Sequence, residues 1–294
     1  MDPVAFHLGP LTIRWYGIFF ALGFLAGYQL LVRRARRSSI GADRAANLTM
    51  LGMVAAMIGA RLLYVIQNWS AEFRDNPAEI IRIDHGGLVF YGGFILGTLL
   101  IVVLSRVRKF PLGEFADLVA PALALAHAFG RVGCFLNGCC FGRVWNGFFA
   151  VTYPPGSQVM QTQYQQGRFP SDLAEKVLQY LHDPARSAPV QCLPVFPVQL
   201  LESATNLVIL ALLLLLEKHL PRRGQLFAVY LMLYAGGRFA NEFLRGDYLE
   251  HVGGLTPAQL ICLGLLPAAV GLFFLFGHFG DARGTLPARA KVQS

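Results

Sequence analysis

An arginine interrupts one of the apolar stretches of this 294-residue chain. Arg131 follows Leu118–Gly130 and opens the run Gly-Arg-Val-Gly-Cys-Phe-Leu-Asn-Gly-Cys-Cys-Phe-Gly-Arg, residues 130–143. A guanidinium inside a membrane costs at least ~2.5–3.5 kcal/mol on insertion scales, so a binding or catalytic role is its default interpretation. The glycines at 130, 133, 138 and 142 add backbone freedom around it. The pattern therefore favours a functional site centred on Arg131.

Two further intramembrane arginines have both a functional and a structural interpretation. Arg238 and Glu242 are four residues apart on one helix, a spacing at which an internal ion pair accounts for both charges. Arg61 precedes Tyr64 by about one helical turn, and packing or snorkelling accounts for it equally well. Both interpretations stay open at the level of the sequence.

The elements that must position these residues are membrane helices. The chain is 55% apolar and 14% charged, whereas a soluble domain is about 25% charged. Segments long enough to cross a ~30 Å hydrocarbon core predict an all-α, polytopic membrane protein of about seven spans, a single integral-membrane domain over 1–294. The predicted spans are 11–32, 46–68, 87–105, 115–136, 196–217, 224–244 and 257–278.

Lysine and arginine predict the orientation of these spans, because cytoplasmic loops retain positive charge. Fourteen fall on one side and seven on the other, although that other side carries the longest loop. We therefore expect the N-terminus outside and the C-terminus in the cytoplasm. The formal charge of +8 follows from this bias toward an anionic lipid surface and gives no reason to expect nucleic-acid binding. The start, Met-Asp-Pro-Val-Ala-Phe, lacks a secretory signal pattern, so the first span is expected to be retained.

The long outer loop, 141–195, is expected to form a small extracytoplasmic cap between spans four and five. Its polar run Gln158–Gln166 and its prolines indicate an exposed segment, and a short helix is predicted near Pro170–His182.

The predicted depths of the polar side chains in the membrane place them in one layer. Arg238 lies 14 residues beyond Gly224, about 21 Å from the inner edge at ~1.5 Å per residue, and hence in the outer third. The layer holds three arginines, Arg61, Arg131 and Arg238, but only two glutamates, so its net charge is positive. This excess favours binding of an anion such as a phospholipid headgroup, because one guanidinium can bind two phosphate oxygens at once. The other members of the layer are Tyr16, Tyr64, Tyr91, Asn137, Gln199, Glu202, Asn206, Asn241 and Glu242.

The five cysteines have no paired zinc-type spacing, and no histidine pattern accompanies them. Small buried residues are the simplest interpretation, and a bond from Cys139 or Cys140 to Cys192 is the alternative if the outer compartment is oxidising. A covalent enzyme intermediate on Cys139 or Cys140 is disfavoured, because a thioether is a poor leaving group. No metal or nucleotide motif stands out, so no cofactor is expected.

The run 130–143 resembles the signature of the prolipoprotein diacylglyceryl transferases. Further similarity extends in order from about Asp2 to Gln259, and a long motif of this kind is far more specific than a short one. The other matching segments are Ile13–Gly17, Gly59–Arg61, Gly86–Gly93, Pro197–Gln199 and Arg238–Arg245.

The resemblance implies transfer of the diacylglyceryl group of phosphatidylglycerol to the lipobox cysteine of a prolipoprotein, which yields a thioether and glycerol phosphate. It also implies a bacterial plasma (inner) membrane enzyme with its site toward the outer leaflet. Arg131 and Arg238 are expected to bind the phosphate and stabilise the leaving group, and Tyr16 to lie near the scissile bond. The remaining headgroup contacts are expected from Arg61, Asn137, Gly142, Glu202 and Glu242, with Glu242 orienting Arg238.

The general base is where the chain departs from one form of that family. Tyr91 stands where some relatives carry histidine, so a histidine base cannot be transferred to it. His127, one turn before Arg131, and His85 are possible replacements, and Tyr91 or water are others. Cys134 occupies the place of a family asparagine, which leaves that contact in doubt.

Two functions from other classes compete with the enzyme. A secondary transporter of an anionic amphiphile also uses intramembrane arginines, but it concentrates polar groups near the midplane, whereas here the inner half is apolar. A lipid-binding scaffold without chemistry explains the arginines but not the long motif.

Overall fold

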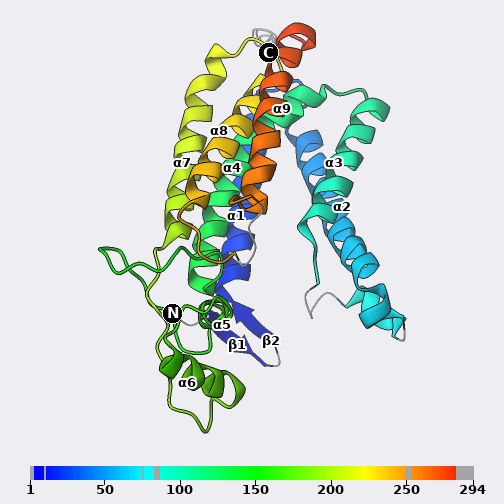
Figure 1. Ribbon diagram of the computed structural model, residues 1–294. Coiled ribbons are helices and arrows are strands. Elements are labelled where there is room, and N and C mark those ends of the chain that lie inside the picture. Colours follow the sequence, from blue (N-terminus) through cyan, green and yellow to red (C-terminus); the bar gives the residue numbers. More distant parts are fainter. Residues whose placement is uncertain (1–2, 10, 75, 83–86, 249–252, 283–294) are drawn as a thin grey trace. The chain divides into compact units, whose positions relative to one another are not determined.

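The computed structural model describes residues 3–9, 11–74, 76–82, 87–248 and 253–282. The chain divides into two compact units, of which the first comprises 1–27 and 119–282 and the second is built mainly from 28–118. Helices dominate both, which confirms the predicted all-α polytopic class (Figure 1). The assignment of 1–294 to one integral-membrane domain stays a prediction.

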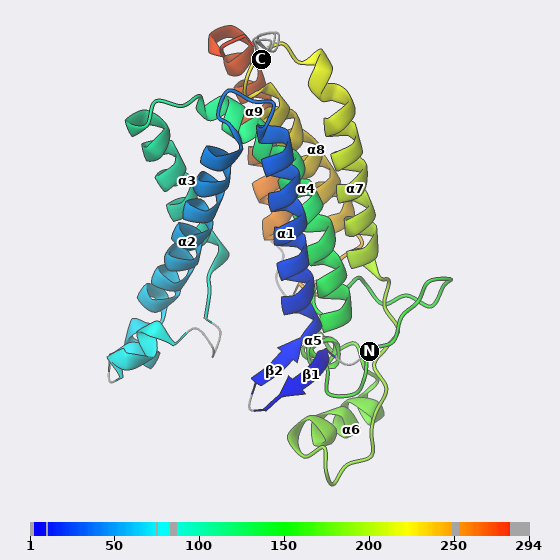
Figure 2. The ribbon, with the colours of Figure 1, turned by 180° about the vertical axis from the view of Figure 1, so that it is seen from behind.

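The first unit is a helical bundle with a small cap at one end. The β-hairpin and the two cap helices lie at the same end, and the last described residues of the C-terminal helix lie at the other (Figures 1 and 2). Its elements are β1 (Val4–Leu8), β2 (Leu11–Arg14), the start of α1 (Trp15–Ala35), most of α4 (Leu112–Asn137), α5 (Gln158–Gln165), α6 (Ser171–His182), α7 (Val198–Leu216), η3 (Glu217–His219), α8 (Gln225–Glu242) and α9 (Pro257–Phe279).

Small and aliphatic side chains hold this bundle together. Ala120 and Ala124 of α4 pack with Ile209 and Leu213 of α7 and with Tyr230 of α8 in one buried cluster. In lipid, where water cannot drive helices together, such close van der Waals packing supplies much of the association energy. The bundle thereby fixes α4, α7 and α8, three of the helices that carry the predicted polar layer.

The cap has a core of its own. Val159 and Met160 of α5, Val177 of α6 and Phe141 belong to a buried cluster that also includes Cys192. The helix predicted near 170–182 is α6, which confirms that prediction. The run 158–166 differs from its prediction, because α5 buries Val159, Met160 and Gln163 and only part of it is exposed.

In the second unit, α2 (Ala42–Gln67) and α3 (Phe90–Val107) form a close helical pair. A Cβ at Gly59 would lie 2.3 Å from the carbonyl oxygen of Gly92, and one at Gly92 would lie 2.2 Å from that of Gly59. Only glycine permits this approach of two backbones. Two short elements, η1 (Trp69–Phe73) and η2 (Pro77–Ile81), follow α2.

Six of the helices are long and apolar enough to span a membrane: α1, α2, α3, α4, α7 with η3, and α9. The seventh predicted span is α8, which packs against α7 and α9 but is less apolar because it carries Arg238, Asn241 and Glu242. Span one begins later than predicted, since Leu11–Arg14 is a strand paired with β1 and α1 starts at Trp15.

Candidate functional site

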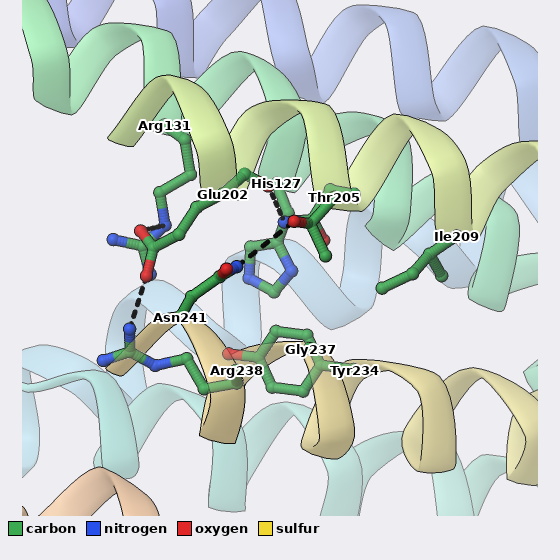
Figure 3. A pocket seen from close by; sticks show the side chains of 10 residues that line it. His127, Arg131, Glu202, Thr205, Ile209, Tyr234, Gly237, Arg238 and Asn241 are labelled. Atoms are coloured by element: carbon green, nitrogen blue, oxygen red, sulfur yellow. Dashed lines mark hydrogen bonds and ion pairs between the residues drawn. The ribbon is translucent and has the colours of Figure 1, made fainter. Parts of the chain in front are cut away.

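The carboxylate of Glu202 on α7 is the centre of the site, where Arg131 and Arg238 meet (Figure 3) and Arg245 approaches as well. Its Oε2 lies 3.1 Å from Nε of Arg131 on α4, and its Oε1 lies 2.5 Å from Nη1 of Arg238 on α8. Nη1 of Arg245, just beyond α8, lies 3.7 Å from the same Oε1. The Glu202 side chain is 3% exposed. A carboxylate buried to this extent needs such partners, because an unpaired charge is costly to remove from water.

Arg238 has a second carboxylate on its own helix. Its Nη1 lies 2.8 Å from Oε2 of Glu242, the i,i+4 pair expected from the sequence. Glu242 Oε1 accepts a hydrogen bond of 2.8 Å from the hydroxyl of Thr256, which also caps the N-terminus of α9 in a capping box with Gln259. The end of α8, the start of α9 and the orientation of Arg238 are thus fixed together.

Arg245 and Asp247 belong to the cluster, and sequence reasoning missed both as site residues. The Arg245 side chain is 4% exposed and forms a two-point pair with Asp247 at 2.8 and 2.6 Å. Burial opposes its charge, but Asp247, Cys140 and Glu202 together more than offset this effect and raise the pKa of Arg245. Gly142 fixes its backbone, since it forms an antiparallel bridge with Arg245 and a Cβ on it would lie 2.4 Å from the Phe196 carbonyl oxygen.

This pairing corrects one expectation. We expected an excess of positive charge, but within the described part of the first unit the three arginines of the cluster face three carboxylates, those of Glu202, Glu242 and Asp247. The count from the sequence included Arg61, which belongs to the second unit, and omitted both Arg245 and Asp247. Net charge therefore does not favour an anion at this site, and affinity for one depends on the geometry of individual donors.

Arg131 supplies that geometry. In the described residues its ionic partner is Glu202, approached through Nε, and neither Nη1 nor Nη2 donates a hydrogen bond there. A cavity of about 10 Å³ lies beside it, enough for about one water molecule. Its walls are His127, Arg131, Glu202, Thr205, Asn206, Ile209, Tyr234, Gly237, Arg238 and Asn241. The amide oxygen of Asn206 is buried and without a hydrogen-bond donor among the described residues.

His127 lines the same cavity as Arg131, as its position one turn earlier indicates. Its ring stacks on Tyr234 at 5.3 Å between centroids, and its Nδ1 lies 3.3 Å from the hydroxyl of Tyr230. One ring nitrogen is thereby held within the bundle.

The cap is joined to the site by one side chain. The amide of Gln166 donates to the backbone carbonyls of Gly246 and Tyr248, at 2.8 and 2.9 Å. The Tyr248 hydroxyl in turn accepts a 3.2 Å hydrogen bond from Nη2 of Arg238. Burial raises the pKa of Tyr248 to about 12, so this phenol keeps its proton at neutral pH.

Asn137 lines a second, larger cavity. This space of about 290 Å³ lies under the cap, and its walls also include Arg14, Tyr153 and Ser157. Sequence reasoning gave Arg14 no role, although it stands in the quoted segment Ile13–Gly17. Asn137 is therefore separated from the small cavity whose walls include Arg131 and Arg238.

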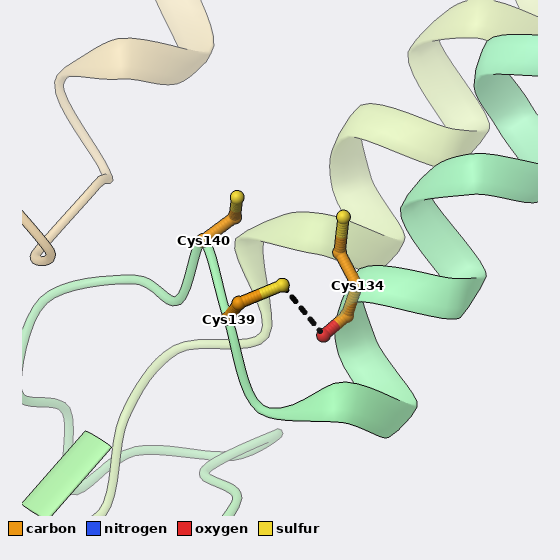
Figure 4. Close-up of side chains that lie close together, drawn as sticks. All are labelled: Cys134, Cys139 and Cys140. Atoms are coloured by element: carbon orange, nitrogen blue, oxygen red, sulfur yellow. Dashed lines mark hydrogen bonds between the residues drawn. The ribbon is translucent and has the colours of Figure 1, made fainter. Parts of the chain in front are cut away.

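Three cysteines meet at the C-terminal end of α4 (Figure 4). The sulfur atoms of Cys134, Cys139 and Cys140 all lie within 4.8 Å of one another. Tyr16 of α1, Arg131 and Arg245 are within electrostatic range of them. All are free thiols, as is Cys192, which lies in the cap core and contacts the Ser157 hydroxyl at 3.4 Å.

The other predicted site residues lie in the second unit. Arg61 donates hydrogen bonds to the backbone carbonyls of Glu79, Ile80, Arg82 and Gly87, which stabilises the segment after α2. Tyr91 lies in the first turn of α3 and is 56% exposed. His85 lies outside the described residues.

Comparison with known proteins shows that the chain is similar to one family. Residues 3–275 match the family model of prolipoprotein diacylglyceryl transferase. Proteins named phosphatidylglycerol–prolipoprotein diacylglyceryl transferase from Staphylococcus aureus strains JH9 and Newman are each 32% identical to it. Each alignment covers 92% of this chain and 88% of the relative.

Proposed function

The chain belongs to the prolipoprotein diacylglyceryl transferases, and we propose that Arg131 and Arg238 bind the phosphate of its phosphatidylglycerol substrate. As a member of that family it is a multi-pass membrane transferase that acts in lipoprotein biogenesis. The observation that carries the proposal is that, within the described residues, the two terminal nitrogens of Arg131 beside the small cavity donate no hydrogen bond.

Those two nitrogens form the planar fork that suits two phosphate oxygens. The side chain of Arg131 is 18% exposed, so the fork is accessible, and Arg238 borders the same cavity. A space for about one water molecule also matches one phosphoryl oxygen in size. Glu202 and Glu242 hold the two guanidiniums in place before the lipid binds. A preorganised pair of cations of this kind stabilises charge that develops in a transition state.

The reaction that this arrangement supports is a displacement at the glyceryl carbon that bears the phosphate. The lipobox cysteine of the prolipoprotein attacks as thiolate, the reactive form of cysteine, a carbon–sulfur bond forms, and glycerol phosphate leaves with the electron pair of the carbon–oxygen bond. Tyr16 lies within electrostatic range of Arg131 and the three thiols, which supports its place near the scissile bond. His127 and Tyr91 are the side-chain candidates for the thiol proton.

The remaining headgroup contacts are proposed for two groups of residues. Asn137 and Gly142 lie at the end of α4 and in the loop after it, at the same end of the unit as the cap. For Arg61, four backbone hydrogen bonds support a structural role, and a headgroup contact would add to that role. We place the site toward the outer leaflet of the bacterial inner membrane, because the hairpin and cap lie at the end predicted to be outside.

Alanine variants of both arginines test the proposal. In bilayers that contain phosphatidylglycerol, with a lipobox peptide, we expect Arg131→Ala and Arg238→Ala each to lower kcat by about 10²–10³, the usual effect of removing one donor to a developing anion. Arg131→Lys should also fail, because an ammonium lacks the fork.

Thioether formation is measured by mass spectrometry, and the melting temperature in detergent shows whether the variants are folded. Arg186→Ala is the matched control, because that arginine is 88% exposed and pairs only loosely with Asp183 at 3.7 Å. Full activity in both alanine variants would remove the proposed roles.

A further inference from the structure

The convergence of Cys134, Cys139 and Cys140 depends on a local reversal of the chain. Cys134 lies in the last turn of α4, and the helix ends at Asn137. Gly138 then has φ +71° and Cys140 has φ +59°, and a non-glycine residue in the left-handed region is uncommon. These two residues turn the chain back, so that the side chains of Cys139 and Cys140 lie opposite that of Cys134 (Figure 4). Such backbone conformations concentrate at functional sites.

Three thiols at this spacing match the ligand set of a soft cation. Zinc binds cysteine sulfur at about 2.3 Å in tetrahedral geometry, which separates the sulfurs by about 3.8 Å. The sulfurs here lie within 4.8 Å of one another, so small side-chain rotations close the site. A disulfide would use two of the three and leave the third unexplained.

The surroundings suit a charged metal–thiolate group with an open position. Three thiolates and one divalent ion carry a net negative charge, and Arg131 and Arg245 lie within electrostatic range to offset it. Cys134 is buried, whereas Cys139 and Cys140 are partly exposed. Zinc sites with three protein ligands and an accessible fourth position are the catalytic kind, and structural sites are closed by four.

We propose that Cys134, Cys139 and Cys140 bind a zinc ion whose fourth ligand is the acceptor thiol of the prolipoprotein. The inference rests on the proposed function and deepens it, because the substrate of that reaction is itself a thiol. A thiol that coordinates a metal is deprotonated, and its proton passes to water. The bound sulfur then attacks the glyceryl carbon, the carbon–oxygen bond breaks, and glycerol phosphate leaves with the electron pair. This route needs no histidine at position 91.

Cobalt substitution tests the site without reference to activity. The full-length protein is purified with its thiols reduced, stripped with a chelator, and titrated with Co(II). We expect one equivalent per chain to produce the sulfur-to-cobalt absorption and the intense visible bands of a tetrahedral thiolate site. A lipobox peptide should shift these bands, and the same peptide with serine in place of cysteine should not.

Serine variants locate the ligands. Cys134→Ser, Cys139→Ser and Cys140→Ser should each lose this spectrum. Cys192→Ser, in the cap core and outside the three-thiol group, should keep it and serves as the matched control. Absence of cobalt binding to the reduced wild-type protein would overturn the proposal. So would thiol titration that finds two of these cysteines joined in a disulfide in active enzyme.

Activity separates failure of this inference from failure of the proposed function. We expect the stripped enzyme to lose thioether formation and to regain it with Zn(II), with binding of phosphatidylglycerol vesicles unchanged. Full transfer by the stripped enzyme would overturn the metal role and leave the transferase function intact. A zinc-loaded enzyme that binds lipid and peptide but never forms thioether would contradict the proposed function, whatever the cobalt spectra show.

Discussion

At the scale of single residues, Glu202 is central to the charge pairing of the site. Its buried carboxylate lies against Arg131, Arg238 and Arg245. Among the described residues Arg131 has no other carboxylate partner, whereas Arg238 and Arg245 also pair with Glu242 and Asp247. Burial makes the loss of such a partner costly.

We expect Glu202→Gln to lower the free energy of unfolding by about 3–5 kcal/mol, the usual cost of removing one partner from a buried ion pair. Asp183→Asn is the control, because its pair with Arg186 is exposed and worth about 0–1 kcal/mol. Denaturant unfolding in detergent measures both. Equal destabilisation by the two substitutions would show that the arginines do not depend on Glu202.

The source of the thiolate is also decided by single residues. If a metal-bound thiol is the nucleophile, neither His127 nor Tyr91 accepts its proton. We therefore expect His127→Ala and Tyr91→Phe to keep the acidic limb of the wild-type pH profile of kcat/KM, which reports ionisations of the free enzyme and substrate. Disappearance of that limb in one variant would identify its side chain as the base.

The sequence could predict contacts between residues that are close together along the chain. Arg238 and Glu242 are one turn apart on one helix, so their pair follows from spacing alone. Arg245 and Asp247 lie beyond the helix end, and only the bridge at Gly142 shows that their charges turn inward. The three-thiol cluster was equally hidden, because it depends on positive φ angles at Gly138 and Cys140 rather than on a metal-type spacing.

At the scale of elements, the lengths of the apolar segments predicted the long helices to within a few residues, because membrane thickness sets the length of a span. The same criterion missed the β-hairpin. Leu11–Arg14 is apolar enough to be counted with the first span, but in the structure it is a strand that pairs with β1. It also overestimated the exposure of α5, whose polar composition hides the buried Val159 and Met160.

The α2–α3 pair provides a test at this scale. A Cβ at Gly92 would lie 2.2 Å from a backbone oxygen that cannot move independently of α2. We expect Gly92→Ala to destabilise the pair by about 1–3 kcal/mol, as overpacking does. Gly52→Ala, on α2 of the same pair, would meet only a flexible Ile101 methyl at 3.4 Å and should be tolerated. Thermal melts followed by circular dichroism compare the two, and similar melting temperatures would refute the backbone contact.

At the scale of the whole molecule, charge bias predicts which side of the membrane the cap faces. An epitope inserted at Arg186, on the exposed surface of the cap, should bind antibody on intact spheroplasts. The same epitope at Arg108, in the turn after α3, should bind only after permeabilisation. The reverse pattern would invert the topology and place the site on the cytoplasmic side.

The shared carboxylate of Glu202 has a consequence for turnover. A phosphate that binds Arg131 and Arg238 must draw them partly away from an anion that is already in place, so affinity for the lipid is a difference between two attractions. When glycerol phosphate dissociates, the Glu202 carboxylate pairs again with both guanidiniums. An internal competitor of this kind keeps a pocket lined by arginines from being inhibited by its own product, and it would let the enzyme cycle.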